Sequence, residues 1–314
     1  MVPSIPRSSQ IPYRNNLWAK LVSIALTLLK VLRSWTTYIE YQLRVSRFFT
    51  FRTHGQRVFF PGCSLTAADP ALVMRTYDWL RARDAHVALW SDCCGMPLDK
   101  FSSANAAARG RKRTLQQLRK LKTTELITAC GNCAVQFAKL AAPGVHITSL
   151  YELLAEEDWG TTSRPQPVMV HHPCSARIDK GQQRHFRAIA ERLHLNIVNI
   201  DDAKHPLPCC LIRSPRAMTQ RKALVENKAF DGERPRLLTY CAHCTMSFQS
   251  DIPTRHVLQE VFGSSEENWV PKGKVSRFRQ YWRFARMALG LRTSTQFQVS
   301  AQDTAPTVAN TDCS

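Results

Sequence analysis

Residues 127–137 read ITACGNCAVQF and residues 238–248 read LTYCAHCTMSF, and these two stretches decide the fold of the chain. A threonine, a Cys-x-x-Cys pair and a phenylalanine recur in the same places, at an offset of 111 residues (127 to 238). The same offset carries Cys63, in FFPGCSL, onto Cys174, in VHHPCSA. Self-similarity at a fixed spacing is typical of a repeated structural unit. The sequence therefore predicts two copies of one unit.

Each copy also contains an adjacent pair of cysteines between these landmarks. Ten of the 11 cysteines thus fall into two five-cysteine patterns. The first consists of Cys63, Cys93, Cys94, Cys130 and Cys133, and the second of Cys174, Cys209, Cys210, Cys241 and Cys244. The remaining cysteine, Cys313, is expected to bind no metal.

Short apolar runs lie ahead of the cysteines, at 58–61, 86–90 and 125–129 in the first half and at 167–171, 196–200 and 237–240 in the second. Helical patterns occupy 70–83, 105–121, 132–140, 182–193 and 216–228. Alternation of strands and helices predicts parallel sheets with crossover helices. The predicted fold is therefore α/β, with two repeated parallel-sheet strand–helix halves related by pseudo-two-fold symmetry and with helical N- and C-terminal extensions. Cysteines that follow parallel strands are expected to gather at the carboxyl edge of the sheet.

Composition narrows the class of protein. With 44% hydrophobic residues, 21% charged residues and 12 glycines in 314 residues, the chain is neither collagen-like nor wholly disordered. The net charge of +19 is concentrated at the ends. Residues 1–60 contain nine basic residues and one acid, and residues 271–292 contain seven basic residues and no acid. The flanks are therefore where a partner or an anionic surface is expected to bind.

Five segments are predicted from these patterns. They are a basic amphipathic extension (1–56), the first cysteine-rich half (57–165), the second cysteine-rich half (166–270), a basic aromatic helix (271–292) and a disordered polar tail (293–314). In the extension, apolar residues between 17 and 35 form a wide face beside a narrow polar stripe, which predicts a helix. This pattern favours a helix that lies on a membrane surface or on a partner, because Lys20 and Lys30 interrupt the apolar run. A packed extra helix and a spanning helix are the alternatives.

Residues 272–292 interleave arginines with aromatic residues. Such a mixture can bind nucleic acid, but no nucleic-acid fold motif accompanies it, so a nucleic-acid partner is disfavoured. A membrane surface or an acidic partner subunit fits better, and a solvated basic helix with one packed face is the alternative.

Five thiols in each half restrict the chemistry of the site. A disulfide network is disfavoured because each half has an odd number of cysteines and no secretory signal is present. Tetrahedral zinc needs four ligands and usually two Cys-x-x-Cys pairs, whereas each half has five cysteines and one such pair. A cubane cluster usually takes three cysteines from one tight run, which is missing here. Five soft ligands that include an adjacent pair suit an iron–sulfur assembly with bridging thiolates.

The doubled pattern of a lone cysteine, a Cys-Cys-Gly and a Cys-x-x-Cys resembles the CCG, or cysteine-rich domain, family over about residues 57–263. This family includes the catalytic B subunit of heterodisulfide reductase. The resemblance implies a noncubane [4Fe–4S] cluster at each set of five cysteines. It implies an oxidoreductase subunit that exchanges electrons with a disulfide, a thiol or a quinone-linked partner.

Two departures from the family pattern qualify this expectation. The second pair is followed by Leu211 where the first is followed by Gly95, so the second motif is the one in which zinc, or no metal, would replace a cluster. The chain also has no cysteine before Cys63 and hence no ferredoxin-like relay of its own. Electrons are therefore expected from or to another subunit that carries ferredoxin-type clusters or flavin. The protein itself is expected in the cytoplasm, with a peripheral position on the inner face of the membrane as the variant of this expectation.

Three histidines lie beside the cysteines in sequence, namely His171, His172 and His243. Each is a candidate to donate a hydrogen bond to a sulfur or to pass a proton to a thiol. The alternative is a supporting or solvent-exposed role. Trp90, Phe137 and Phe248 are predicted to lie in the core. A non-catalytic assembly or maturation factor of the same fold is the alternative function.

Overall fold

A computed structural model describes residues 17–45, 50–140, 142–159, 167–198, 210, 215–226, 235–249, 252–263, 269, 286 and 289–290. Residues 271–285 and 293–314, and hence most of the predicted basic aromatic helix and all of the predicted tail, lie outside these ranges. Cys209, Leu211 and Cys313 also lie outside them.

The first half is built on a parallel sheet. Its strands are β2 (Arg57–Phe60), β3 (Ala88–Ser91), β4 (Glu125–Thr128) and β5 (His146–Ser149), in the order β3-β2-β4-β5. A short strand, β1 (Phe51–Arg52), adds to β3 in antiparallel orientation. The three strands predicted before the cysteines of this half are therefore confirmed, and they are neighbours in one sheet.

The second half repeats this arrangement with a smaller sheet of β6 (Val168–His171), β7 (Arg236–Thr239) and β8 (Thr254–His256), all parallel. In the first half Phe59 pairs with Ile127, and in the second half Val170 pairs with Leu238. Each member of the second pair lies 111 residues after its counterpart (59 to 170 and 127 to 238). The repeat in the sequence is thus a repeat in strand register.

The strand predicted at 196–200 is the exception. Within the part of the chain that the structure describes, this segment makes one parallel bridge, between Ile197 and Val168. The bridge consists of two hydrogen bonds, from Val168 N to Asn196 O and from Val198 N to Val168 O. It occupies the edge that β3 occupies in the first sheet, so the order of the strands is preserved.

All five predicted helices inside the repeats are confirmed with small shifts of their ends. They are α3 (Pro70–Arg83), α5 (Ala104–Leu121), α6 (Gly131–Leu140), α9 (Gly181–Arg192) and α10 (Pro215–Glu226). The sequence supplies their starts: Asp69 accepts a hydrogen bond from Leu72 N ahead of Pro70, and Ser103 accepts one from Ala106 N.

Six shorter helices were not predicted, because five to seven residues are too few to show a helical period. They are α2 (Cys63–Ala68), α4 (Met96–Phe101), α7 (Leu150–Leu154), α8 (Cys174–Ile178), α11 (Ala242–Phe248) and α12 (Val257–Phe262).

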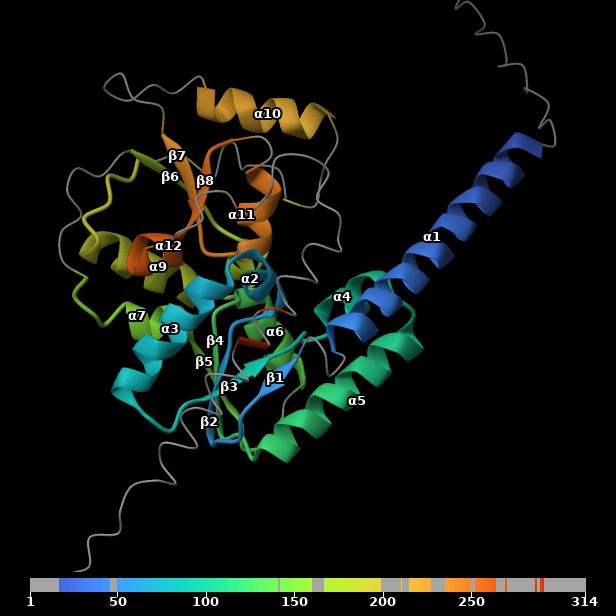
Figure 1. Ribbon diagram of the computed structural model, residues 1–314. Coiled ribbons are helices and arrows are strands. Elements are labelled where there is room, and N and C mark those ends of the chain that lie inside the picture. Colours follow the sequence, from blue (N-terminus) through green and yellow to red (C-terminus); the bar gives the residue numbers. More distant parts are fainter. Residues whose placement is uncertain are drawn as a thin grey trace, which may run out of the picture.

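The two halves interlock through these short helices. Helix α2 of the first half packs against α11 of the second (Figure 1). In the same way, α8 of the second half packs against α6 of the first. Each half therefore places the helix of its first cysteine on the Cys-x-x-Cys helix of the other half. One hydrophobic core runs across the contact and includes Phe59, Ile127 and Leu238. Because each half makes the same contact with the other, the structure has the predicted pseudo-two-fold arrangement.

Helix α1 (Leu17–Arg44) is longer than the predicted 17–35 and projects from the body as a rod (Figure 1). Its last turns pack on α4 and on the first cysteine site. Arg33 lies over the ring of Phe101, and Tyr41 is 3% exposed. The described part of the chain contains no helix that is long and apolar enough to cross a membrane.

The second sheet contains a buried histidine that couples stability to pH. His256 caps α12, where its Nδ1 accepts a hydrogen bond from Leu258 N, and its Nε2 has no hydrogen-bond partner among the described residues. Burial lowers the pKa of His256 from 6.5 to about 3. Between these values the unfolded chain binds a proton that the folded chain does not. The contribution to stability is therefore complete above pH 6.5 and is lost as the pH falls toward 3.

We expect the titration of His256 to lower the free energy of unfolding by about 2 kcal/mol when the pH falls from about 7.5 to about 5. Urea unfolding at the two pH values measures the loss. The variant His256→Asn keeps a side-chain acceptor at the cap but does not titrate, so its loss should be smaller by that amount. Equal losses in the two proteins would contradict the assignment.

Candidate functional site

The first cysteine site lies at the carboxyl edge of the first sheet, as predicted. Cys63 follows β2 and begins α2, Cys93 and Cys94 follow β3, and Cys130 follows β4 immediately before α6. Cys133 lies in the first turn of α6 and is buried. Three neighbouring parallel strands therefore deliver all five sulfurs to one edge.

The sulfurs of this site interact directly. The Cys133 side chain hydrogen bonds with those of Cys130 and Cys94, and Cys63 interacts electrostatically with Cys130. Cys93 packs in the same hydrophobic cluster as Cys63. Hydrogen bonds to Cys130 and Cys94, together with burial, raise the pKa of the Cys133 thiol well above its usual value. The hydrogen bond with Cys133 lowers the pKa of Cys130. Burial and mutual repulsion disfavour several thiolates at one site, so a strong positive charge nearby would be needed to keep these cysteines deprotonated at the same time.

Gly62 lets the backbone approach these sulfurs. Its φ is +81°, and a Cβ added there would lie 3.2 Å from Cys130 Cβ and 3.3 Å from Cys133 Sγ. Both the left-handed conformation and the close approach favour glycine. The corresponding residue of the second half is Pro173, with φ of −59°, so this feature is not repeated.

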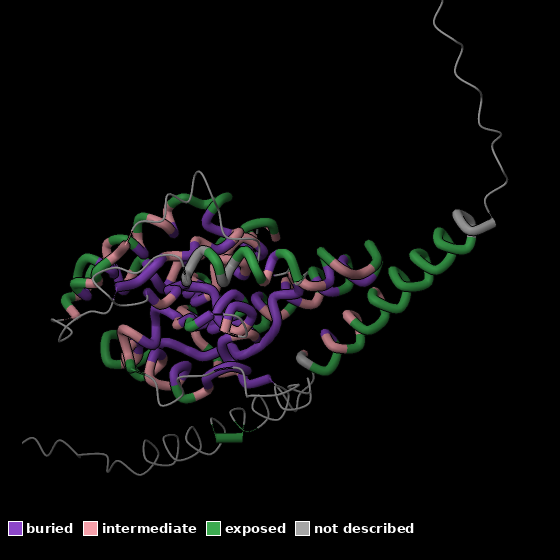
Figure 2. Tube along the Cα trace, turned by 90° about the horizontal axis from the view of Figure 1, so that it is seen from above, coloured by how far each residue is buried: buried purple, intermediate pink, exposed green. Residues whose placement is uncertain are grey.

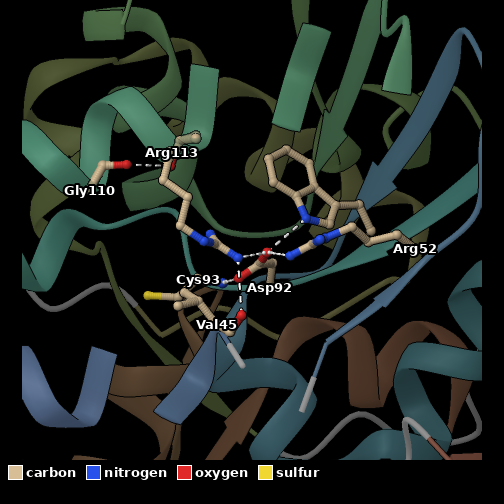
Figure 3. Close-up of polar contacts among 8 residues, drawn as sticks. Val45, Arg52, Asp92, Cys93, Gly110 and Arg113 are labelled. Carbon is tan, nitrogen blue, oxygen red and sulfur yellow. Dashed lines mark hydrogen bonds and ion pairs between the residues drawn. The ribbon is translucent and has the colours of Figure 1, made fainter. Parts of the chain in front are cut away.

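Asp92 organises the residues that support Cys93 (Figure 3). Its fully buried carboxylate forms ion pairs with Arg52 at 2.7 Å and Arg113 at 2.8 Å. It also accepts hydrogen bonds from Cys93 N at 2.7 Å and from Trp90 Nε1 at 3.0 Å. Since Arg52 comes from β1 and Arg113 from α5, one carboxylate fixes the start of the Cys-Cys pair relative to two other elements.

Helix α1 is tied to the same network. Arg113 donates a hydrogen bond to Val45 O at 3.2 Å (Figure 3), and its guanidinium lies over the ring of Tyr41. Tyr41 packs in one hydrophobic cluster with Cys63 and Cys93. Burial raises the pKa of Tyr41 to about 12, so the phenol stays protonated at neutral pH.

Three cysteines of the second site repeat the arrangement of their counterparts in the first. Cys241 follows β7, Cys244 lies in α11, and Cys210 packs with both in one buried cluster. Hydrogen bonds to Cys210 and Cys241, together with burial, raise the pKa of the Cys244 thiol well above its usual value. Cys210 and Cys244 thus repeat the relation between Cys94 and Cys133.

Cys174, from the second half, contacts the first Cys-x-x-Cys, and a tyrosine connects the two Cys-x-x-Cys loops. Cys174 Sγ lies 3.5 Å from the side-chain oxygen of Asn132, which stands between the two cysteines of the first Cys-x-x-Cys. The hydroxyl of Tyr151 lies 2.8 Å from Ala129 O and 3.0 Å from Tyr240 O, the residues that precede Cys130 and Cys241. A buried tyrosine therefore bridges the two Cys-x-x-Cys loops.

The three candidate histidines have different surroundings. His171 is buried and its ring meets that of Phe248 edge-on at 4.7 Å. His172 Nδ1 lies 2.9 Å from the hydroxyl of Tyr240, and His243 is exposed. Trp90, Phe137 and Phe248 lie in the core, as predicted.

The donor chemistry of the first site suits a soft metal ion or a metal cluster. Its ligands would be five soft sulfurs, four of them buried, beside a glycine that keeps the chain close to two of them. Metal ions deprotonate thiols and supply the positive charge that such a group of sulfurs needs. Among the residues that the structure describes, no group of three or more His, Cys, Asp or Glu side chains has the arrangement of a metal site.

Sequence reasoning missed the residues that support the sulfurs, namely Asp92, Arg52, Arg113, Tyr41 and Tyr151. Asp92 directly precedes the Cys-Cys pair, which was the one local signal available. Its partners lie 21 and 40 residues away in the chain, and no periodic pattern connects them.

Fold and site together define a repeated α/β protein with a cysteine site at the carboxyl edge of each parallel sheet. Residues 57–138 match the family described as "CCG: Cysteine-rich domain". This stretch, which contains all five cysteines of the first site, is a cysteine-rich domain of that family, and the resemblance predicted from the sequence is confirmed there.

Other comparisons add little. No curated protein matches the chain. An aspartate racemase homologue from Pyrococcus horikoshii is 13% identical, with a TM-score of 0.29, over 66% of this chain and 96% of its own. A glutamate racemase from Bacillus anthracis is 12% identical, with a TM-score of 0.29, over 79% of this chain and 84% of its own. Likenesses at this level do not bear on the site.

Proposed function

We propose that this protein is the iron–sulfur subunit of a redox complex and exchanges electrons with a disulfide, thiol or quinone-linked partner. The observation that carries the proposal is the group of sulfurs in the first half, where Cys133 hydrogen bonds with both Cys130 and Cys94. The cysteine-rich domain match over residues 57–138 supports a cluster-binding protein.

Cys63, Cys93, Cys94, Cys130 and Cys133 would hold a noncubane [4Fe–4S] cluster, which supplies one-electron redox chemistry when bound. The protein itself contributes position and surroundings. Gly62 brings the backbone to the sulfurs, and Asp92 holds the backbone N–H of Cys93. Phe60, Trp90 and Phe137 pack against each other beneath the site and exclude water from it.

The second site would take a second cluster or zinc. Its sulfurs repeat the first, but three supporting positions differ: Pro173 replaces Gly62, Pro208 replaces Asp92 before the cysteine pair, and Leu211 replaces Gly95 after it. Gly62 and Gly95 adopt a left-handed backbone, with φ of +81° and +83°. Proline cannot adopt this conformation, and leucine adopts it rarely. These departures favour a different metal in the second site.

The electron partner would be a separate subunit with ferredoxin-type clusters or flavin, since the described residues hold cysteines only within the two repeats. The complex would be cytoplasmic, because cysteines must stay reduced to bind metal and the cytoplasm keeps thiols reduced.

Anaerobic purification of the full chain, followed by iron, acid-labile sulfide and zinc analysis and EPR spectroscopy, tests the proposal. The expected result is iron and sulfide in about equal amounts, as in a [4Fe–4S] cluster, with a paramagnetic signal in one oxidation state. Zinc alone would overturn it. A cluster-containing protein that turns over no disulfide or quinone substrate would instead support the assembly factor.

A further inference from the structure

Helix α1 carries a continuous apolar stripe that the described part of the protein does not cover. Leu21, Leu28, Leu32, Trp35 and Ile39 follow each other at spacings of three, four and seven, so they share one face. Leu28, Leu32 and Trp35 are 58%, 60% and 63% exposed. Figure 2 shows the outer turns of this helix as exposed along their length.

The body of the protein binds a different face of the same helix. Ser34 lies 3.3 Å from the hydroxyl of Ser102, Tyr38 faces Arg109, and Tyr41 and Val45 pack with the first cysteine site. With 3.6 residues per turn, this contact face lies roughly 130° around the helix from the apolar stripe. Docking of α1 therefore leaves the stripe pointing away from the protein rather than burying it.

Shape and charge identify the surface that the stripe fits. Exposed apolar residues from Val31 through Leu28 to Val22 cover about half of the helix circumference, which is wider than the narrow seam of a two-stranded coiled coil. No acidic residue precedes Glu40. Arg33 is exposed at the edge of the apolar face, and Lys30 is exposed on the polar side of the helix. A wide apolar face, combined with cations and no acid on the remaining surface, is typical of helices that lie in the interface of an anionic membrane.

We infer that α1 binds flat on an anionic lipid surface through this stripe, with the cysteine-rich body held on the aqueous side. The stripe from Leu21 to Ile39 extends along about 27 Å of the helix. The contact does not require that the cysteines hold a cluster. The stripe ends at Ile39, two residues before Tyr41, which packs with Cys63 and Cys93 of the first site.

Flotation of the full-length protein with phosphatidylcholine vesicles, with and without phosphatidylglycerol, tests the inference. Binding is expected to the anionic vesicles and to weaken at high salt. The variant Leu28→Glu/Leu32→Glu should lower the bound fraction about tenfold or more, because it places charges on the buried face. Its fold should be unchanged, since both leucines are exposed.

The matched control is Ser23→Glu/Thr27→Glu, which adds the same charge on the polar side of the helix, where both residues are exposed. It should retain most of the binding. Equal flotation of the Leu28→Glu/Leu32→Glu variant and the wild type would overturn the inference, because another segment would then be the lipid contact. Absence of flotation together with a dimer that the same variant dissociates would overturn it in favour of a second copy.

Discussion

Anaerobically purified Cys133→Ser protein is expected to lose the iron and acid-labile sulfide of the first site. Cys133 is the sulfur that contacts both Cys130 and Cys94, so its loss removes a ligand from the centre of the group. A serine hydroxyl is a poor ligand for iron in such clusters, and the remaining buried thiols would stay protonated. Iron and sulfide analysis against protein concentration measures the change.

Variants of the other cysteines make the result specific. Cys94→Ser should behave like Cys133→Ser, because the two side chains hydrogen bond. Cys313→Ser is the matched control, since this cysteine stands outside both repeats in the sequence. Cys244→Ser reports on the second site: a further loss of iron indicates a second cluster, and a loss of zinc indicates a structural metal. Full iron content in Cys133→Ser and Cys94→Ser would contradict the proposed ligand set.

Replacing Asp92 by alanine is expected to lower the free energy of unfolding by about 4 kcal/mol. The change leaves Arg52 and Arg113 without the carboxylate that they share, and it deprives Trp90 Nε1 and Cys93 N of their acceptor. Removing one partner of a buried ion pair costs more than the pair itself contributes, because the remaining charges stay desolvated. Urea unfolding under anaerobic conditions measures the effect.

An exposed ion pair provides the control for Asp92. Arg83 and Glu157 contact at 2.6 Å, but their side chains are 41% and 32% exposed. Glu157→Gln should therefore cost less than about 1 kcal/mol. Asp92→Ala should also reduce the iron content of the first site, because Cys93 loses its anchor, whereas Glu157→Gln should not. A loss of stability in Asp92→Ala no larger than in Glu157→Gln would show that the network does not support the site.

Prediction from the sequence succeeded where the signal was local or repeated. Helix α3 was predicted with the observed ends because its length allows several turns of the helical pattern. Strands β2, β4, β6 and β7 were found because each is apolar and stands directly before a cysteine. Helices α2 and α8 were missed, since neither is long enough to show a period, although they carry Cys63 and Cys174.

The sequence alone determined that two halves exist, which cysteines belong to each half and which strands precede them. These properties depend on residue identity and on spacing along the chain, and neither changes when the chain folds. The register of the two sheets follows the same offset, because strands of one repeat pair through the same hydrophobic pattern.

Only the tertiary structure decided how the halves meet and what surrounds the sulfurs. Helices α2 and α8 each pack on the other half of the protein. Tyr151 connects the two Cys-x-x-Cys loops, and Arg52 and Arg113 both contact Asp92. All of these contacts join residues that are far apart in the chain. It also decided which face of α1 the body covers. The physical reason is that such contacts arise from packing in three dimensions. The periodicity and the composition of a single segment do not determine which distant segment it packs against.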